Sequence, residues 1–375
     1  MNKRSFNVSE ARRRNRLKTI KKWASTLFFL FFILVGVAYG WNFVVRPKLA
    51  EKNFNKFLVS TGCEGEVVLE KMSQGFCLLS KRNLHLYENS GNQIKSFDFN
   101  LERPAVHCCG GLALVYDRNG KVCSLMTSEK SLCNLCCEDN ILLAKVAENG
   151  NFVVATQGDS FFTKFCVYDK TGRELFKKHF AENLIVDFDF IGSGTGCFVC
   201  TLGVSNEGFD RTTIYRFDFN QNQEVSKQEV ADAVPVFLKA VGTRACLVCF
   251  NKLLLLDGSC AIVRYLNFKD DWTNFFVSNR GYSIFSFANS FTNRLVAYDK
   301  FANVLGEFEL NEVVRKIKLV GNRVFVLVDD KLIVCGLNLK ILKTIELNKH
   351  ADDFFCTDKY CYFLFGTRVD RIKLF

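Results

Sequence analysis

Residues 141–180 read ILLAKVAENGNFVVATQGDSFFTKFCVYDKTGRELFKKHF, and this stretch decides the fold. It separates into four runs rich in apolar residues, Ile141–Ala147, Phe152–Thr156, Phe162–Tyr168 and Glu174–Phe180, with polar turn residues between them. Runs of about 5–7 residues bounded by Gly, Asn and Asp are typical of β-strands joined by tight turns. Four such strands make one blade of a β-propeller, and 184–230 repeats the arrangement.

A shorter element recurs along the chain: an aliphatic run that ends in Asp or Glu, followed by a polar turn. It occurs as LHLYENSGN (84–92), LALVYDRNGK (112–121), FCVYDKTGR (165–173), TIYRFDFNQN (213–222), LLLLDGSC (253–260) and RLVAYDKFAN (294–303), with a degenerate copy LIVCGLNLK (332–340). A carboxylate at the end of a strand can accept the N–H groups of the turn, and Gly or Asn supplies a positive φ. We therefore interpret these acidic residues as turn-forming, not catalytic.

The spacing of this element predicts the architecture. The equivalent points are taken as Glu88, Asp117, Asp169, Asp218, Asp257, Asp299 and Gly336, which are separated by 29, 52, 49, 39, 42 and 37 residues. Most steps lie near the length of about 40–50 residues that a four-stranded blade needs. The chain is therefore predicted to be all-β, with a seven- or eight-bladed propeller whose second blade, near 104–126, is short.

The end of the chain indicates how the ring closes. Three predicted strands, Phe354–Thr357, Tyr360–Phe365 and Arg368–Lys373, lack a fourth partner. A strand near Glu66–Glu70 is expected to supply it, because joining the first and last blades removes exposed sheet edges. The alternative of two separate β domains would need a linker, and no Pro/Ser-rich stretch occurs between 62 and 375.

The positive charge is concentrated in a short segment. The formal net charge is +11, but residues 1–22 hold nine cations and only Glu10 as an acid, which leaves +3 for the remainder. The predicted propeller is thus close to neutral, so we expect no nucleic-acid partner. The cations that are expected to set topology are Arg12, Arg13, Arg14, Arg16, Lys18, Lys21 and Lys22.

A membrane anchor is predicted directly after these cations. Residues 23–45, WASTLFFLFFILVGVAYGWNFVV, carry no charge and as a helix would span about 30 Å of hydrocarbon. Apolar and interfacial aromatic residues define the anchor: Trp23, Leu27, Phe28, Phe32, Leu34, Tyr39 and Trp41. The excess of cations before the segment predicts a cytoplasmic tail (1–22), a single transmembrane helix (23–45), a polar stalk (46–61) and an extracytoplasmic propeller (62–375).

Two other interpretations of this segment stay open. Ala38-Tyr39-Gly40 has the small-x-small form of a signal-peptidase site, so the segment could be a cleaved signal. It could also be a buried helix of a soluble domain. The length of the basic region, and the apolar residues that continue to Val45, favour the uncleaved anchor.

The 17 cysteines are an odd number and cannot all pair within one chain. Several lie inside apolar strands, Cys77, Cys123, Cys166, Cys246, Cys335 and Cys361, where a free thiol acts as a small hydrophobe. Cys133, Cys136 and Cys137 form the densest group, in expected loops, and are weak candidates for a metal site. Free thiols, disulfides and metal ligation all stay open here.

No motif points to a reaction. The four histidines are scattered, and G-x-S-x-G, H-E-x-x-H and G-x-x-x-x-G-K[ST] are absent from the sequence. Residues 192–196, GSGTG, lie between two predicted strands and are interpreted as a loop. Trp272, Phe275 and Phe276 could face a ligand, but packing between blades is the favoured interpretation. We therefore predict no catalytic residue and no cofactor.

The basic tail, the apolar segment and the repeats LVYDRNGK, ILLAKVAENGNFVVAT, FCVYDKTGRELFKK and DFDFIGSGTGCFVCTLG together resemble a known family. It is a domain-of-unknown-function family of membrane-anchored β-propeller proteins of Gram-positive bacteria, with WD40- and quinoprotein-like repeats. The resemblance covers nearly the whole chain and implies a propeller outside the cytoplasmic membrane. It supplies no catalytic residues.

These observations favour a binding or scaffold module in the cell envelope, with a protein or glycan partner. The alternative is an envelope enzyme or cofactor binder, quinoprotein-like or glycan-acting, with its site at the mouth of the propeller channel. A cluster of His, Arg, Asp and Glu from several blades would favour the enzyme. A mouth lined by apolar residues would favour binding.

Overall fold

The computed structural model describes residues 35–36, 39, 56–60, 62, 65–158, 161–204, 208, 210–221, 223–288, 293–347 and 349–374. The chain divides into two compact units, Met1–Lys56 and Phe57–Phe375. The predicted basic tail lies outside the described residues, as does the predicted membrane segment apart from Val35, Gly36 and Tyr39. Within the described ranges no helix is both long enough and apolar enough to cross a membrane.

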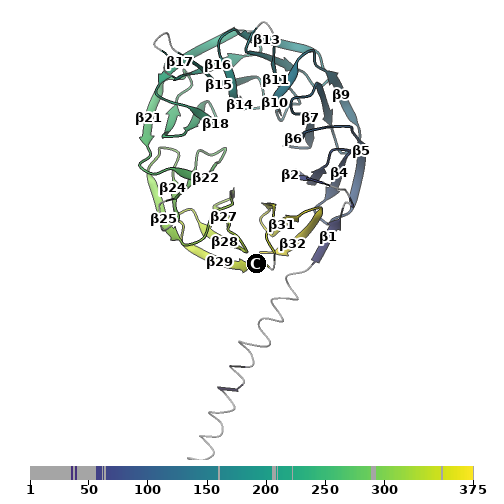
Figure 1. Ribbon diagram of the computed structural model, residues 1–375, viewed down its shortest axis with the longest axis vertical. Helices are drawn as coiled ribbons and strands as arrows, with labels where there is room; N and C mark the ends of the chain where they lie inside the picture. Colours follow the sequence, from purple (N-terminus) through teal and green to yellow (C-terminus); the bar gives the residue numbers. More distant parts are fainter. Residues whose placement is uncertain are drawn as a thin grey trace, which may run out of the picture. The chain divides into compact units, whose positions relative to one another are not determined.

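The second unit is a β-propeller of eight four-stranded antiparallel sheets arranged around an axis (Figure 1). The prediction of an all-β propeller is confirmed, and the number of blades is eight. In blades 1–7 the strands follow chain order from the axis outward, so the first strand is innermost and the fourth lies at the rim (Figure 1). Only the first strands therefore surround the axis.

The first four blades span 68–231. Blade 1 holds β2 (Val68–Met72), β3 (Gly75–Leu79), β4 (Asn83–Glu88) and β5 (Gln93–Asp98); blade 2 holds β6 (Pro104–Cys109), β7 (Leu112–Asp117), β8 (Val122–Met126) and β9 (Ser131–Cys136). Blade 3 holds β10 (Asn140–Val146), β11 (Phe152–Gln157), β12 (Thr163–Tyr168) and β13 (Glu174–Phe180); blade 4 holds β14 (Leu184–Ile191), β15 (Gly196–Val204), β16 (Asp210–Asp218) and β17 (Gln223–Ala231).

The remaining blades span 235–373 together with one strand from the start of the unit. Blade 5 holds β18 (Pro235–Val241), β19 (Arg244–Cys249), β20 (Lys252–Leu256) and β21 (Ile262–Asn267); blade 6 holds β22 (Trp272–Val277), β23 (Ser283–Ala288), β24 (Asn293–Tyr298) and β25 (Val304–Leu310). Blade 7 holds β26 (Lys316–Val320), β27 (Arg323–Leu327), β28 (Lys331–Gly336) and β29 (Ile341–Glu346); blade 8 holds β30 (Asp353–Cys356), β31 (Tyr360–Phe365), β32 (Arg368–Lys373) and β1 (Lys56–Ser60).

An N-terminal strand completes the last blade, as expected, but it is not the predicted one. The fourth strand of blade 8 is β1, which pairs with β32, whereas 66–70 belongs largely to β2, the innermost strand of blade 1. The propeller therefore begins inside the segment that was predicted to be a stalk. The physical reason is that Val59 is buried and Leu58 half-buried, in a cluster with Phe355 and Tyr362.

The prediction of a short second blade is wrong, because blade 2 has four strands. The error came from Asp117, which ends the second strand of its blade, whereas the other turn residues end third strands. Its carboxylate accepts the backbone N–H groups of Glu102 (3.3 Å) and Arg103 (2.7 Å), which precede β6. The turn of blade 2 that follows its third strand begins at Thr127. With Thr127 in place of Asp117, the steps of 29 and 52 residues between Glu88 and Asp169 become 39 and 42 residues.

The turns between third and fourth strands share one geometry in five blades. In blade 3 the N–H of Gly172 donates to the carbonyl of Asp169 (2.9 Å), and the N–H of Asp169 donates to the carbonyl of Arg173 (2.9 Å). Gly172 has φ 88°, and Cys260, Ala302 and Leu339 hold the same position with positive φ. The predicted role of the turn carboxylates is confirmed for Asp169, Asp257 and Asp299, which accept N–H groups of their own turns.

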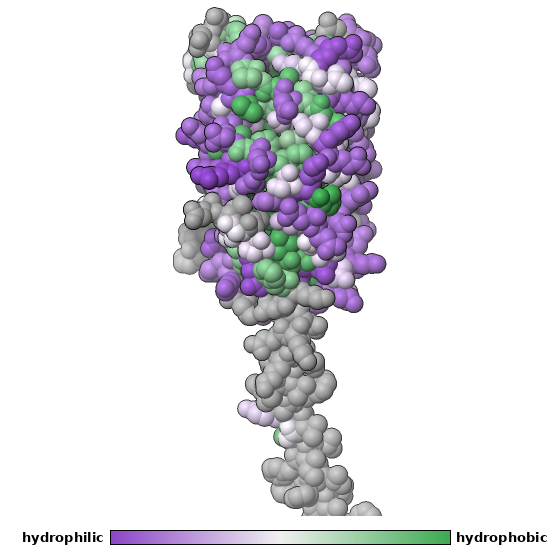
Figure 2. All heavy atoms as spheres, turned by 90° about the vertical axis from the view of Figure 1, so that its right-hand side faces the viewer, coloured by the Kyte–Doolittle hydropathy of each residue, from purple (hydrophilic) through white to green (hydrophobic). Residues whose placement is uncertain are grey.

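The core lies between neighbouring blades. Phe165 of blade 3 packs edge-on against Phe188 of blade 4, with ring centroids 5.4 Å apart, and lies 6.0 Å from the ring of Phe217. The middle strands are covered on both faces by adjacent blades, which explains their continuous apolar sequences. Figure 2 shows one side of the rim, where hydrophilic residues surround small apolar areas.

Candidate functional site

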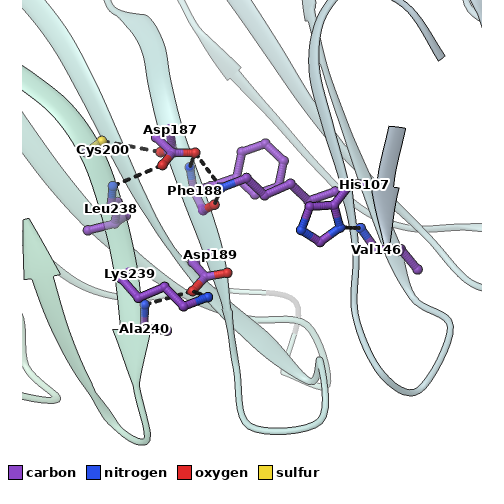
Figure 3. A network of polar contacts seen from close by, with 10 residues as sticks. His107, Val146, Asp187, Phe188, Asp189, Cys200, Leu238, Lys239 and Ala240 are labelled. Atoms are coloured by element: carbon purple, nitrogen blue, oxygen red, sulfur yellow. Dashed lines mark hydrogen bonds and ion pairs between the residues drawn. The ribbon is translucent and has the colours of Figure 1, made fainter. Parts of the chain in front are cut away.

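Five polar side chains on the innermost strands of blades 2–5 form a group that we call the axial cluster: His107, Lys145, Asp187, Asp189 and Lys239 (Figure 3). Each strand is otherwise mainly apolar, as in LIVDFDFI for β14. The cluster therefore brings polar groups from four consecutive blades together beside the axis.

Asp187 and Lys145 form a buried ion pair. The ammonium of Lys145 lies 2.6 Å from Asp187 Oδ1 and donates to the carbonyl oxygen of Phe188 (2.8 Å). Asp187 Oδ1 also accepts the N–H of Phe188 (2.8 Å), and Oδ2 accepts the N–H of Leu238 (2.9 Å) on β18. Burial alone would lower the pKa of Lys145, but the carboxylates of Asp187 and Asp189 outweigh burial and raise it. Lys145 is therefore charged at neutral pH.

Asp189 repeats this pattern two residues further along β14. Its Oδ2 accepts the N–H of Ala240 (2.9 Å) and lies 2.8 Å from the ammonium of Lys239 (Figure 3). Both carboxylates thus bond to the backbone of β18, which has no strand pairing with β14. They join blade 4 to blade 5 where the two innermost strands run side by side.

His107 joins blade 2 to blade 3 in a similar way. Its Nδ1 accepts the N–H of Val146 (3.2 Å), so the neutral ring carries its proton on Nε2. Burial, together with the positive charge of Lys145, lowers the pKa of His107 to about 4. The imidazole is therefore neutral at physiological pH, and its Nε2–H is able to donate a hydrogen bond.

A second axial group lies across the junction of blades 7, 8 and 1 and contains Glu70, Lys316, Lys318 and Asp353. The ammonium of Lys316 lies 2.5 Å from Asp353 Oδ1. Burial raises the pKa of Glu70 against the opposing effect of Lys318, and burial together with Lys316 lowers the pKa of Lys318. Here too, opposite charges from neighbouring blades face each other.

The sequence and the fold were compared with those of known proteins. The profile of a family described as a family of unknown function (DUF5711) matches residues 52–374, which is most of the chain. The chain belongs to the DUF5711 family. No curated protein matches the sequence of this DUF5711 chain.

Solved structures share the fold of this DUF5711 protein at low sequence identity. BamB from Moraxella catarrhalis is 10% identical, with a TM-score of 0.56 over 85% of this chain and 99% of that chain. AztD from Citrobacter koseri is 11% identical, with a TM-score of 0.55 over 78% of this chain and 89% of that chain. The Dos1 propeller is 14% identical, with a TM-score of 0.57 over 82% of this chain and 92% of that chain. At these identities the similarity shows the fold alone.

The expected resemblance to a β-propeller family of unknown function is thereby confirmed. Membrane anchoring and an origin in Gram-positive bacteria stay predictions.

The polar atoms of the axial cluster in the DUF5711 chain mainly bond neighbouring blades to each other, which suits them poorly to proton transfer. A general base needs an oxygen or nitrogen that is free to accept a proton. The carboxylates of Asp187 and Asp189 accept backbone N–H groups and lysine ammonium groups, and His107 uses Nδ1 as an acceptor. The cluster can still offer the Nε2–H of His107 and the lysine charges to a ligand.

The predicted cysteine group does not form a metal centre in the described structure. Cys133 and Cys136 lie in β9 and Cys137 follows it directly, so the expectation that they occupy loops is wrong. Cys133 is buried and Cys136 exposed, because residues three apart in a strand point to opposite faces. Over the described residues, no group of three or more His, Cys, Asp or Glu side chains could hold a metal ion.

Most of the other cysteines that the structure describes are core thiols, and two form a disulfide. Cys361, one of the cysteines inside apolar strands, is bonded to Cys356 directly across β30 and β31. Cys197, Cys200, Cys246 and Cys249 are buried in the clusters of apolar side chains between blades. The Sγ atoms of Cys77 and Cys108, in blades 1 and 2, lie 3.5 Å apart without a bond.

The three aromatics that could have faced a ligand, Trp272, Phe275 and Phe276, pack between blades. Trp272 lies edge-on to Phe275 with ring centroids 4.9 Å apart, and its Nε1–H donates to the carbonyl of Cys249 (3.2 Å). Phe275 also contacts Phe237 of blade 5, at 5.5 Å, and Phe276 packs on the core between blades 6 and 7. The favoured interpretation as packing residues is confirmed.

The axial cluster was missed because its members are far apart in the sequence and belong to no turn motif. A signal was nevertheless present. A single charge interrupts the apolar first strands ILLAKVA (141–147) and PVFLKAV (235–241), and two interrupt LIVDFDF (184–190). Charged residues are rarely placed in strands that face a core unless they are paired. Comparing first strands across the repeats would have identified these residues.

The depressed pKa of His107 predicts a pH-dependent stability. Below about pH 6.5 the unfolded chain takes up a proton at His107, whereas the folded chain does so only near pH 4. This group should therefore lower the free energy of unfolding by about 3 kcal/mol between pH 7 and pH 4. Denaturant unfolding across this range should show a smaller loss for His107→Gln, whose amide oxygen can still accept the N–H of Val146. Parallel curves for the two proteins would contradict the assignment.

Proposed function

We propose that this protein is a binding or scaffold module of the cell envelope, held by a single membrane anchor with its propeller outside the cytoplasmic membrane. Its partner would be an envelope protein or glycan. The propeller offers two ends and a rim for contact, and the anchor would keep it close to the membrane.

A cluster of His and Asp from several blades was the feature expected of an enzyme, and the axial cluster has that composition. The bonding of its members, however, supports a binding role and carries the proposal. The lysines and aspartates of the cluster are paired with each other and with the backbone of neighbouring blades, and His107 is neutral. An enzyme of the quinoprotein-like or glycan-acting kind would need reactive groups at the axis that are free to exchange protons with a substrate. Because the side chains of the axial cluster already bond neighbouring blades, we favour a rigid binding domain over an enzyme.

The proposed placement rests on the sequence of residues 1–45. The uncharged segment 23–45 follows nine cations, and positive charge near a membrane helix favours the cytoplasmic side. Clustered Lys and Arg beside such a helix would also attract anionic lipid headgroups, at about 1 kcal/mol each.

Thiol labelling of intact cells tests this placement. Cys136 is exposed, whereas most other free cysteines of the propeller are buried. In a Cys63→Ser background, a membrane-impermeant maleimide should label the protein on intact cells, and Cys136→Ser should remove most of this labelling. A Ser5→Cys variant that also carries Cys136→Ser should react only after permeabilisation. Labelling of Cys136 only in permeabilised cells would overturn the proposed orientation.

Photo-crosslinking in living cells tests the binding role. A benzophenone amino acid can replace exposed apolar residues around the ring, such as Ile94, Phe250, Phe301 and Leu342. A binding module should give one discrete adduct from neighbouring positions and none from the opposite side. The absence of adducts at all four positions would count against a stable partner.

A further inference from the structure

A groove opens between blades 5 and 6 and encloses a cavity of about 610 Å³. It is bounded by the hairpin that joins β18 to β19, the hairpin that joins β22 to β23, the beginning of β21, and the turn after β24. Its apolar lining includes Val241, Leu255, Val263 and Phe301.

The groove is also basic. Its lining includes the exposed side chains of Arg244, Arg264, Arg280 and Lys300, and no acidic residue. The nearest carboxylates, of Asp257 beside Arg244 and Asp299 beside Arg264, accept the N–H groups of their own turns. By contrast, a cavity of about 660 Å³ near blades 1 and 2 is lined by both signs of charge: Glu66, Glu70, Glu102, Lys81, Arg103 and Arg118.

Neutral partners hold two of the guanidinium groups in place. Arg264 Nη1 donates to Asn303 Oδ1 (2.9 Å), and Arg280 Nη1 donates to Asn322 Oδ1 (3.3 Å) while lying over the ring of Tyr282. Amide and aromatic partners orient a guanidinium without cancelling its charge. Both groups therefore stay available to an anion.

One wall of the groove is a sheet edge with exposed apolar residues. In β21, Ile262 is 38% exposed, Val263 56% and Tyr265 63%. The strand pairs with β20 and is the outermost strand of its sheet. Edge strands commonly carry charges that discourage pairing, as Glu224, Lys227 and Glu229 do in β17, whereas the only charge in β21 is Arg264.

We propose that this groove binds an extended, acidic segment of a partner protein, which adds as a fifth strand along β21. Strand addition supplies main-chain hydrogen bonds, and alternate side chains then enter neighbouring pockets. Apolar side chains of the segment would lie on Val263 and Phe301, and its carboxylates would face Arg244, Arg264, Arg280 and Lys300. This proposal rests on the proposed binding function and specifies the chemistry of the partner.

Fluorescence anisotropy on the full chain tests the proposal with a labelled ten-residue peptide of alternating glutamate and valine. This peptide should bind, more weakly at high salt, whereas a peptide of alternating lysine and valine should not. Arg264→Glu/Arg280→Glu should weaken binding at least tenfold. The matched control Lys121→Glu/Lys359→Glu makes the same change in net charge at exposed sites on blades 2 and 8 and should bind like the wild type.

A further variant separates strand addition from simple attraction between charges. Val263→Lys makes the groove more basic but removes an exposed apolar contact, so it should weaken binding of the glutamate–valine peptide. Tighter binding by this variant, unchanged binding by Arg264→Glu/Arg280→Glu, or equal binding of both peptides would overturn the proposal. The proposal would also be wrong if the peptide does not bind while polyphosphate or anionic phospholipid vesicles bind the wild type and do not bind Arg264→Glu/Arg280→Glu.

Different results would contradict the binding function of the protein and the groove as its binding site. If the peptide does not bind but the photo-crosslinked adduct persists in Arg264→Glu/Arg280→Glu, the binding function stands and the groove is not its site. If neither the adduct nor the predicted labelling pattern is found, the proposed function fails whatever the peptide does.

Discussion

Asp187→Ala should lower the free energy of unfolding by about 3–5 kcal/mol, because it leaves the charge of Lys145 buried without its partner. It also removes the acceptor for the N–H of Leu238, so the junction between blades 4 and 5 is weakened directly. Denaturant unfolding of wild type and variant measures the difference.

Two further variants test whether this loss of stability comes from the buried pair of Lys145 and Asp187. The double substitution Lys145→Met/Asp187→Leu removes both charges and should recover about 2 kcal/mol or more of the loss. Asp270→Ala breaks an exposed pair with Arg294, at 3.0 Å, and should cost less than about 1 kcal/mol. If Asp187→Ala is no more harmful than Asp270→Ala, the axial cluster does not hold the blades together.

A chain that begins at residue 62 should be much less stable than one that begins at residue 53, because it lacks β1 and blade 8 then ends at β32. Losing the buried Val59 alone removes about 1.5–3 kcal/mol of apolar burial, and Leu58 and the strand pairing add to this. We expect a total on the order of 4 kcal/mol and a fall in Tm of roughly 6 °C, measured by thermal unfolding.

The shorter chain should also associate through its exposed edge, which light scattering would detect. A synthetic peptide of residues 53–62 should restore its Tm. Equal melting of the two truncated chains would show that β1 contributes nothing to ring closure.

The repeats of the sequence predicted the architecture because turn chemistry is local. Asp169 and Asp299 end strands in the same way, and their spacing indicates blades of similar length. Asp117 gave two wrong steps in the spacing because it ends a second strand, and the turn that follows it has the same sequence signature as the turns after third strands. The short strand at 56–60 was missed because five residues beside a polar stretch give too little periodicity to identify a strand.

The axial cluster and the basic groove could not be predicted in the same way. His107, Lys145 and Asp187 come from three blades, and Arg264 and Arg280 from two, so their proximity depends on how blades are arranged around the axis. No spacing within a single repeat carries that information. Only the closed ring brings these side chains together.

The pairing of β1 with β32 also has a consequence for biosynthesis. More than 300 residues separate these two strands in the sequence, so the first strand to emerge during translation must wait for nearly the last. Until then β1 lacks its pairing partner, and only the part of its apolar cluster that blade 1 supplies, such as Phe76 and Leu78, is available to cover Leu58 and Val59. We therefore expect the newborn chain to depend on a chaperone, or on an early docking site for this strand, until synthesis ends.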